Sequence, residues 1–429
     1  MTFDQIPADW VMATLGEVAT DGGLVGGPFG SMLGRKDYVA DGVPVIRGTN
    51  ISDSGRFKLD DLVFVTQEKV TQDLLRNTAA PGDIVLTQRG TLGQAGVIPD
   101  DTYPLWVVSQ SQERLRVDRA KADRDFVYFV LRSPAMVNEI ARRAITTGVP
   151  HINLGITQEL PIPLPPLEEQ HRIALILNYF DDKIENSQRI AEILEEIAGT
   201  LFKARFVDFV DHDDLVESEI GWIPQEWKVA SLSEITRVLT RGRGPAYVDE
   251  GGVQVLNQKC IRDGRVSFEL ARRNDEDRRS STDRRVELGD VLINSTGVGT
   301  LGRVAQVSWL PEATTIDSHV TMVRADDTVT EQDYLAMALL MRQGDLERLG
   351  HGSTGQTELT RSRLAEFSIP VPPMDEQRAL SKSSGPIRGA RAALERESLT
   401  IATLRDALLP KLISGQIRVP ATGPDEPAA

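Results

Sequence analysis

The sequence predicts an α+β protein in which one module occurs twice, each copy a mixed α/β domain followed by a long helix. Residues 162–173 read IPLPPLEEQHRI, and residues 369–380 read IPVPPMDEQRAL. After each of these segments, apolar residues recur at the seven-residue spacing of a coiled coil. Each half of the 429 residues is also long enough to bury its own core.

The duplication runs through both halves, because shorter matches occur in the same order. IPADW at 6–10 matches IPQEW at 223–227, and GDIVLTQRGTLG at 82–93 matches GDVLINSTGVGTLG at 289–302. The expected segments are a first domain at 1–160, a Pro-rich leader with the first long helix at 161–215, a second domain at 216–367, a second long helix at 368–420 and a disordered tail at 421–429.

Strands are expected in the first part of each half. Short β-branched runs bounded by Gly, Pro or Asp occur at residues 43–46, 84–87 and 291–294. Their composition and length are typical of strands. One amphipathic helix per half should follow, at 123–143 and at 331–349.

A long helix is predicted after Pro165 and Pro166. Glu168 and Glu169 suit its first turn, because carboxylates there oppose the positive end of the helix dipole. A helix over 168–206 would be roughly 60 Å long at the usual rise per residue. No single domain needs a helix of that length, so it should pair with another helix. The residues expected on its pairing face are Ile173, Leu177, Phe180, Ile184, Leu194 and Leu201.

The second half contains a partner for this helix, although Gly385 and Pro386 weaken its first turns. We expect this second helix to start late or to kink near Pro386. An antiparallel pair would give the duplicated chain pseudo-twofold symmetry. The alternative is two unrelated surface helices, each packed on its own domain. The residues expected on the second pairing face are Leu380, Ile387, Leu394, Ile401 and Leu408.

Composition narrows the class of protein. Cys260 is the single cysteine, so we expect no disulfides and a reducing compartment. No apolar run of about 18 residues and no signal-peptide pattern is present, so we expect a cytoplasmic protein without a membrane segment. The net charge of −15 differs from the basic character of dedicated nucleic-acid binders. It does not exclude one, because binding depends on where the charges lie.

No catalytic residue and no metal site is expected. The sequence lacks a GxxxxGK[ST] phosphate loop, HExxH, CxxC, and the NPPY or DPPY tetrapeptide of amino-methylating enzymes. The five histidines have no metal-ligand spacing. Cys260 should be a small buried hydrophobic residue. The carboxylate pairs Glu168/Glu169 and Asp375/Glu376 are better explained as helix-start charges.

Binding residues are easier to propose. Arg47, Asn50 and Gln88 in the first half, and Asn257 and Gln258 in the second, lie in or beside polar turns. Asn, Gln and Arg side chains can form paired hydrogen bonds with adenine and guanine edges, and loop glycines let the backbone approach phosphate. The alternative for any one of these residues is an ordinary solvated loop.

Together, these motifs resemble a known family. GGPFGSML with Asp37 and Tyr38, then GVPVIRGTNI, GDIVLTQRG and TTGVPHINL, followed by LPIPLPPLEEQ and a long helix, is similar to the specificity (S) subunit of Type I restriction-modification systems. The resemblance covers residues 6 to about 420, and the repeated Pro-rich motif before a heptad helix is its specific part. The second copy departs from the pattern, since RGRGPAY stands in place of GGPFGS.

The resemblance implies a protein of phage defence that is not itself an enzyme. Each half would be a target recognition domain that reads one part of a bipartite double-stranded DNA sequence, and the helices would set the gap between the parts. The chain would dock two methyltransferase (M) subunits, and restriction (R) subunits would join through the complex. S-adenosylmethionine, ATP and Mg would be bound by those partners, and no cofactor by this chain.

The resemblance also extends the set of candidate DNA-binding residues to loops that match the family. Two rival functions remain: a stand-alone enzyme fused to a recognition module, against which the missing catalytic motifs speak, and a helical scaffold that binds proteins through its two globular halves. Changing Arg47 or Gln258 should alter the DNA target under the recognition hypothesis only. The candidates are Arg47, Thr49, Asn50, Gln88, Arg89, Thr91, Thr147, His151 and Asn153 in the first half and Arg243, Asn257, Gln258, Lys259, Asn294, Thr296, Thr354 and Gln356 in the second.

Overall fold

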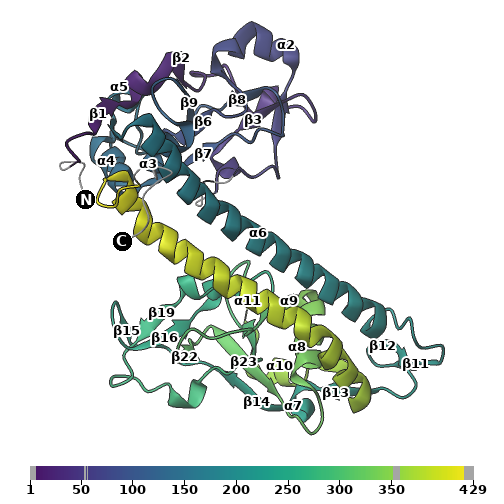
Figure 1. The fold of residues 1–429 in the computed structure, drawn as a ribbon. Coiled ribbons are helices and arrows are strands. Elements are labelled where there is room, and N and C mark those ends of the chain that lie inside the picture. Colours follow the sequence, from purple (N-terminus) through teal and green to yellow (C-terminus); the bar gives the residue numbers. More distant parts are fainter. Residues whose placement is uncertain (1–5, 53–54, 56, 351–357, 420–429) are drawn as a thin grey trace, which may run out of the picture. The chain divides into compact units, whose positions relative to one another are not determined.

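A computed structural model describes residues 6–52, 55, 57–350 and 358–419 of the chain (Figure 1). The chain divides into two units. Unit 1 comprises Met1–Glu185 and Leu399–Ala429, and unit 2 comprises Asn186–Ser398. The division crosses both long helices, α6 (Leu167–Phe206) and α11 (Met374–Ile413). Each unit therefore contains one sheet-rich domain together with part of each long helix.

Unit 1 is built on two four-stranded sheets and one strand pair. The strand pair is antiparallel and brings the start of the domain, β1 (Val11–Thr14), to the Pro-rich leader, β10 (Pro161–Leu164). The first sheet is antiparallel and has the order β2 (Ala19–Gly26), β9 (Gln112–Val117), β6 (Ile84–Thr87), β7 (Ala95–Val97). The second sheet includes a parallel β3–β8 pair and has the order β4 (Val63–Val65), β3 (Val43–Ile46), β8 (Trp106–Val108), β5 (Thr78–Ala79).

The single helix predicted at 123–143 is wrong, because the structure has two helices there. The first ends at Ser133, which is extended and buried, and its hydroxyl accepts a hydrogen bond from the Met136 N–H. Pro134 follows at the first helical position, where its missing N–H costs nothing, and it keeps Ser133 out of the helical region. The helices of unit 1 besides the long ones are α1 (Leu15–Val18), α2 (Gln67–Lys69), α3 (Arg124–Arg132), α4 (Pro134–Arg143) and α5 (Leu154–Gln158).

Unit 2 repeats this plan, as the duplication predicts. The strand pair is β13 (Lys228–Ser231) with β24 (Ser368–Val371), again antiparallel. The two sheets have the orders β14 (Thr236–Arg241), β23 (Val320–Ala325), β20 (Val291–Asn294), β21 (Val304–Gln306) and β15 (Tyr247–Val248), β19 (Arg272–Asn274), β16 (Val253–Leu256), β22 (Thr314–Ile316).

Unit 2 also has two additional hairpins, β11 (Leu215–Ser218) with β12 (Gly221–Pro224) and β17 (Ile261–Arg262) with β18 (Arg265–Val266). Its shorter helices are α7 (Leu232–Ile235), α8 (Gln332–Met341), α9 (Gln343–Gly350) and α10 (Arg361–Ala365). The helix predicted at 331–349 is thus also two, because the chain leaves the helical conformation at Arg342.

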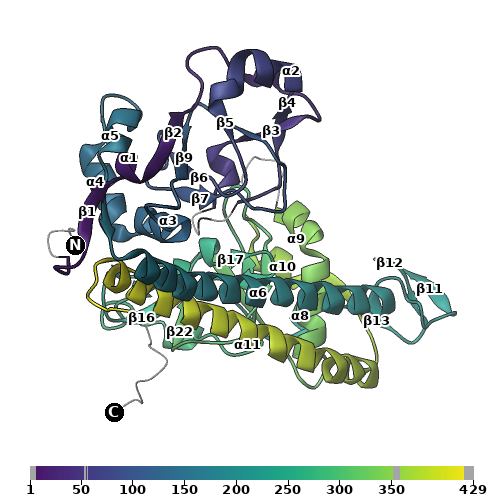
Figure 2. The same cartoon turned by 45° about the horizontal axis from the view of Figure 1, so that its top comes forward.

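The Pro-rich motif has the same structural role in both units. The buried Gln170 accepts a hydrogen bond from the Asp123 N–H and donates one to the Pro165 carbonyl, both at 2.8 Å. Gln377 makes the matching bonds to Glu331 and Pro372, also at 2.8 Å. Each glutamine fastens the start of α3 or α8 to the start of a long helix, and Figure 2 shows α3 beside the first turns of α6. The motif is repeated because both domains need this connection.

Each long helix contributes to the core of the unit in which it lies. In unit 1, Ile173 and Leu177 of α6 and Leu409 of α11 pack with the buried side chains of the first sheet and of α3. In unit 2, Phe202 of α6 and Leu380 of α11 pack in the same way against β20, β23 and α8. The helices are therefore integral to both domains.

Within each unit, α6 and α11 run antiparallel. In unit 1, Arg405 of α11 bonds to Asp181 of α6 at 2.5 Å, and Arg418, which follows the end of α11, bonds to Glu169 at 2.8 Å. In unit 2, the Ser187 hydroxyl lies 3.3 Å from the Glu397 carboxylate, and Arg391 forms an ion pair with Glu195. Along these pairs, the residue numbers on α11 decrease as those on α6 increase. The two helices are therefore not unrelated surface helices. The predicted antiparallel pairing is present in each unit.

Two details of the helix prediction are wrong. Of the two outcomes expected for the second helix, the late start is wrong, since α11 begins at Met374 and continues through Gly385 and Pro386; the kink near Pro386 stays a prediction. Pro386 removes the bond to the Lys382 carbonyl, but both residues are exposed, so water can replace that bond.

The second error concerns Leu201, whose side chain is 52% exposed while that of the neighbouring Phe202 is buried. A straight helix rotates by about 20° per heptad relative to a perfect seven-residue repeat, so the row that begins at Ile173 turns outward after four heptads. The other predicted pairing residues are buried or half-buried: Ile173, Leu177, Phe180, Ile184, Leu194, Leu380, Ile387, Leu394, Ile401 and Leu408.

Candidate nucleic-acid interface

Three loops of unit 1 meet where β2 and β6 end. The Gln88 side chain donates to the Gln110 carbonyl at 2.9 Å, and the Gln110 side chain donates to the carbonyls of Gly30 and Leu33. His151 forms one isolated β-bridge with Arg89 and another with Ile145, so the loop that leads to α5 also joins this surface. Sequence separation between these loops is large, and only the sheet brings them together. Sequence reasoning missed Gln110, because this residue lies in no motif.

The predicted residues of unit 1 differ in how far they are exposed. Thr49, Arg89, Thr91, Thr147 and Asn153 are exposed, whereas Gln88, Arg47 and His151 are half-buried. Asn50 is buried instead: its side-chain oxygen accepts from the Arg47 N–H, and its nitrogen reaches the carbonyls of Lys58 and Asp60. The role predicted for Asn50 in DNA contact is therefore corrected to positioning the loop that holds Arg47.

In unit 2, two predicted asparagines are likewise internal. Asn257 accepts from the Lys259 N–H and donates to the Leu270 carbonyl, and Asn294 donates to the Gln258 carbonyl. Both side chains are buried, so they cannot reach a base edge as placed. Their predicted DNA contact is corrected to support of the loop that carries Gln258 and Lys259.

The remaining candidates of unit 2 lie nearer the surface. Thr296 and His319 share a hydrogen bond of 2.6 Å, which links the loop after β20 to the residues before β23. Lys259 is exposed, and Arg243 pairs with Asp283 at 2.8 Å. His319 was not among the predicted residues, and its place beside Thr296 follows only from the strand pairing. Thr354 and Gln356 lie outside the described residues.

The site has no arrangement suited to nucleophilic or metal-assisted chemistry in the described part of the chain. Among those residues, no group of three or more His, Cys, Asp or Glu side chains could hold a metal ion. Burial raises the pKa of the Cys260 thiol to about 11, so the reactive thiolate is scarce at neutral pH. The polar groups that these loops do offer are donors and acceptors for binding.

A second surface lies on α6. In unit 2, this helix exposes a row of large apolar side chains at helical spacing, which face water. Exposed apolar rows of this kind mark interaction sites more often than isolated exposed residues do. The row consists of Ile190, Ile193, Ile197 and Leu201.

Across the residues that the structure describes, no helix is long and apolar enough to cross a membrane.

Comparison with known proteins agrees with this architecture. The domain model described as "Type I restriction modification DNA specificity domain" matches residues 7–195 and 224–382, one match per half. The Type I restriction enzyme MjaIX specificity subunit of Methanocaldococcus jannaschii is 24% identical over 436 residues, which cover 97% of this chain and 95% of that protein. The MjaVIII specificity subunit of the same organism is 27% identical over 281 residues, covering 64% of this chain and 66% of that protein.

A solved structure shares the fold. The crystal structure of a Type I restriction-modification S subunit from M. genitalium aligns with a TM-score of 0.60 at 18% identity. The alignment covers 96% of this chain and 99% of that one. At this identity the likeness concerns the fold, which is the arrangement of two sheet-rich domains and two long helices.

Proposed function

The chain belongs to the Type I restriction modification DNA specificity family, and from this membership we propose that it reads a bipartite double-stranded DNA target, with one half-site for each domain. Recognition of target DNA without catalysis is the role of the family's specificity subunits. The observation that carries the bipartite proposal is the repetition of the loop surface: the loops after β2 and β6 in unit 1 recur after β14 and β20 in unit 2. Two equivalent reading surfaces call for two half-sites.

The acidic composition is compatible with this proposal. Exposed Arg89 lies in the loop after β6 of unit 1, and exposed Lys259 follows β16 of unit 2, in the turn to which Asn294 at the end of β20 is hydrogen-bonded. Each can meet a phosphate or a guanine edge. The net charge of −15 opposes DNA binding by the whole chain at long range. Partner subunits that share the contact with DNA would offset that repulsion.

We propose further that the chain docks two M subunits, and that the exposed row Ile190, Ile193, Ile197 and Leu201 of α6 is part of one docking face. R subunits would join through the complex, and S-adenosylmethionine, ATP and Mg would be bound by the partners. The assembly would act in the cytoplasm, where its DNA lies. The continuous helices, roughly 60 Å at 40 residues each, would set the length of the gap between the half-sites.

The deciding experiment is single-molecule sequencing of adenine methylation in cells that express the chain with its neighbouring methyltransferase. A two-part methylated motif should disappear when this chain alone is deleted. Arg89→Ala should relax only the first part of the motif, and Lys259→Ala only the second. An unchanged methylome in an active system would support the rival function of a protein-binding scaffold.

Docking is tested on the same chain by reversing the polarity of the α6 face. Ile193→Glu combined with Ile197→Glu should abolish co-elution with the M subunit in size-exclusion chromatography, because two buried carboxylates would face an apolar partner. The control is Val329→Glu, since Val329 is similarly exposed but lies between β23 and α8, outside both long helices. Equal co-elution of all three proteins would contradict the docking proposal.

A further inference from the structure

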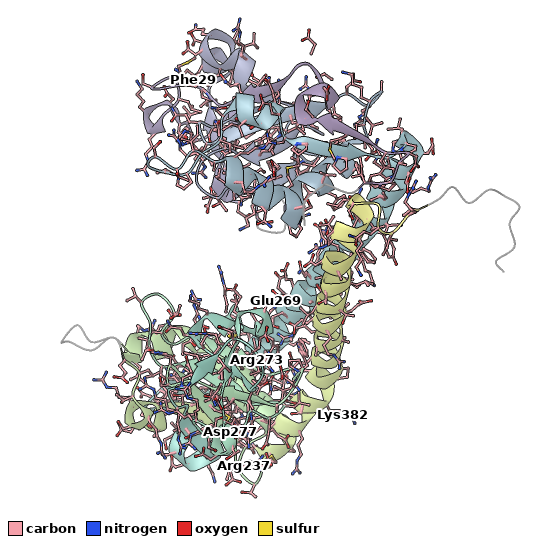
Figure 3. The ribbon with its side chains drawn as sticks, turned by 90° about the vertical axis from the view of Figure 1, so that its left-hand side faces the viewer. Phe29, Arg237, Glu269, Arg273, Asp277 and Lys382 are labelled. Atoms are coloured by element: carbon pink, nitrogen blue, oxygen red, sulfur yellow. The ribbon has the colours of Figure 1, made fainter. Side chains whose placement is uncertain are left out.

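The loop that follows β2 exposes an aromatic side chain that the reading surface described so far does not use. Phe29 is 83% exposed, and Met32, three residues later, is 42% exposed. Figure 3 labels Phe29 at the outer edge of unit 1, on the side opposite the first turns of α6. Other aromatic rings of this unit pack on one another, as Phe57 and Tyr103 do on Trp106. An exposed ring of this size loses the stabilisation that burial would give it.

The exposure of Phe29 is a result of how the loop is fixed. The Gly27 N–H donates to the Gln112 carbonyl at 2.9 Å, and a Cβ at Gly27 would lie 1.9 Å from the Ser109 carbonyl oxygen. On the other side of Phe29, the Gln110 side chain donates to the Gly30 carbonyl. Because hydrogen bonds hold the backbone on both sides of Phe29, the loop keeps the ring at the surface.

The same contacts join Phe29 to the reading loops. Gln110, which holds Gly30, also accepts a hydrogen bond from Gln88 at 2.9 Å. The exposed cations Arg35 and Lys36 follow in the same loop. An exposed ring in a loop that also exposes two cations suits nucleic acid, because aromatic rings stack on bases or enter base steps while Arg and Lys meet the phosphates.

We propose that Phe29 is an apolar wedge that packs against an unstacked base step of the first DNA half-site. This inference rests on the proposed function, and it adds a mode of recognition: the first half-site is read partly through the ease with which its bases unstack. Arg35 and Lys36 hold the adjoining phosphates, and Met32 extends the apolar contact.

The second domain has no aromatic residue at the position that matches Phe29. Gly242 matches Gly27, because its N–H donates to the Val320 carbonyl as Gly27 does to Gln112, and a Cβ there would also meet backbone oxygens. Two residues later the second copy has Gly244, where the first has Phe29. Under this proposal, unstacking by an aromatic side chain of this loop occurs at the first half-site only.

The test uses the full chain assembled with its methyltransferase subunits on a duplex that carries the target. 2-Aminopurine is placed in turn at each base step of both half-sites, leaving out the adenines that are methylated. Binding should raise the fluorescence at one position of the first half-site and at none of the second. Phe29→Ala should remove this rise and weaken target binding by about tenfold, whereas Phe29→Trp should keep both.

Leu288→Ala is the matched control, because Leu288 is 66% exposed and lies before β20, in the other unit. Unchanged fluorescence and affinity in Phe29→Ala, with target-specific binding by the wild type, would overturn the wedge alone. Equal binding of target and unrelated DNA by the wild type would overturn the proposed function as well. A loss of M-subunit assembly in Phe29→Ala would show that the ring docks protein and would also overturn the wedge.

Discussion

Two buried polar side chains of unit 1, Gln170 and Glu113, have opposite effects on its stability. Gln170 satisfies two backbone groups, the Asp123 N–H and the Pro165 carbonyl. Glu113, on β9, is fully buried, and Thr157 lies near its carboxylate. The Thr157 hydroxyl donates to the Asn153 carbonyl, so neither carboxylate oxygen receives a hydrogen bond from the described residues. A buried amide with two bonds stabilises the fold, whereas a buried carboxylate without any destabilises it once ionised.

Replacing Gln170 by Ala should lower the free energy of unfolding of unit 1 by about 2–3 kcal/mol, because two buried backbone groups lose their partners. The measurement is urea denaturation, with hydrogen exchange in α3 as the probe of unfolding. The control is Gln416→Ala, which removes an exposed glutamine from the same unit. An equal effect of the two changes would mean that water replaces the lost bonds.

Glu113 should make the stability of unit 1 depend on pH. Burial raises the pKa of its carboxyl from the ordinary 4.5 to about 6. A raised folded-state pKa gives a stabilisation that is complete below the unfolded value and lost as pH rises through 6. The loss should be about 2 kcal/mol. Glu113→Gln should remove this dependence, which denaturation of both proteins between pH 4.5 and 7.5 would detect; parallel curves would contradict it.

At the scale of elements, the long helices combine an apolar face with buried ion pairs. Arg391 is buried on α11, pairs with Glu195 of α6 and lies 3.5 Å from Glu395. Glu395 in turn accepts a hydrogen bond from Ser308 and lies 3.7 Å from Arg265. This network fastens both helices to the second domain, in a stretch of α11 where Gly385, Pro386 and Gly389 would otherwise weaken the helix.

Arg391→Met should destabilise unit 2 by about 3–5 kcal/mol, because it leaves the carboxylates of Glu195 and Glu395 without their buried partner. The double variant with Glu195→Gln should recover part of that loss, since one of the two uncompensated charges is gone. Thermal denaturation of the three proteins measures the difference. If the double variant were no more stable than Arg391→Met, the pair would not be coupled as the structure implies.

The sequence predicted the elements better than their ends or the fate of single side chains. Heptad spacing predicted α6 and α11 because long helices depend on local periodicity. The break at Ser133 was missed, since the amphipathic pattern continues across it and only Pro134 marks it. Asn50, Asn257 and Asn294 were assigned to DNA because their chemistry suits bases. The same chemistry bonds backbone groups inside a loop, and only tertiary structure distinguishes the two uses.

At the scale of the whole molecule, unit 1 is completed by the end of the chain. Leu409, Leu412 and Ile413 of α11 belong to its core. Arg418 pairs with Asp9 and Glu169, and its guanidinium holds the pKa of both carboxyls below their ordinary values. The N-terminal domain therefore depends on residues near the C-terminus, whereas unit 2 is one continuous stretch.

Ending the chain after Ser398 should consequently unfold unit 1 and spare unit 2. The truncation removes three buried apolar side chains, each of which contributes about 2–5 kcal/mol in a packed core. Hydrogen exchange should accelerate in β6 and β9 but not in β20 and β23. Arg418→Ala provides a milder comparison, since it removes the ion pairs with Asp9 and with the buried Glu169 but no apolar side chain of the core. Equal protection of both sheets in the truncated chain would contradict the prediction.

The ribosome therefore starts unit 1 before unit 2, but unit 2 is the first to have all its residues. The N-terminal domain emerges first, yet its last apolar contacts wait until α11 has been made. Unit 2 has all its residues before that point. A chain that stops early would leave the N-terminal domain unfolded and open to proteases. Incomplete copies of this protein should therefore be degraded before they can compete with complete copies for partners.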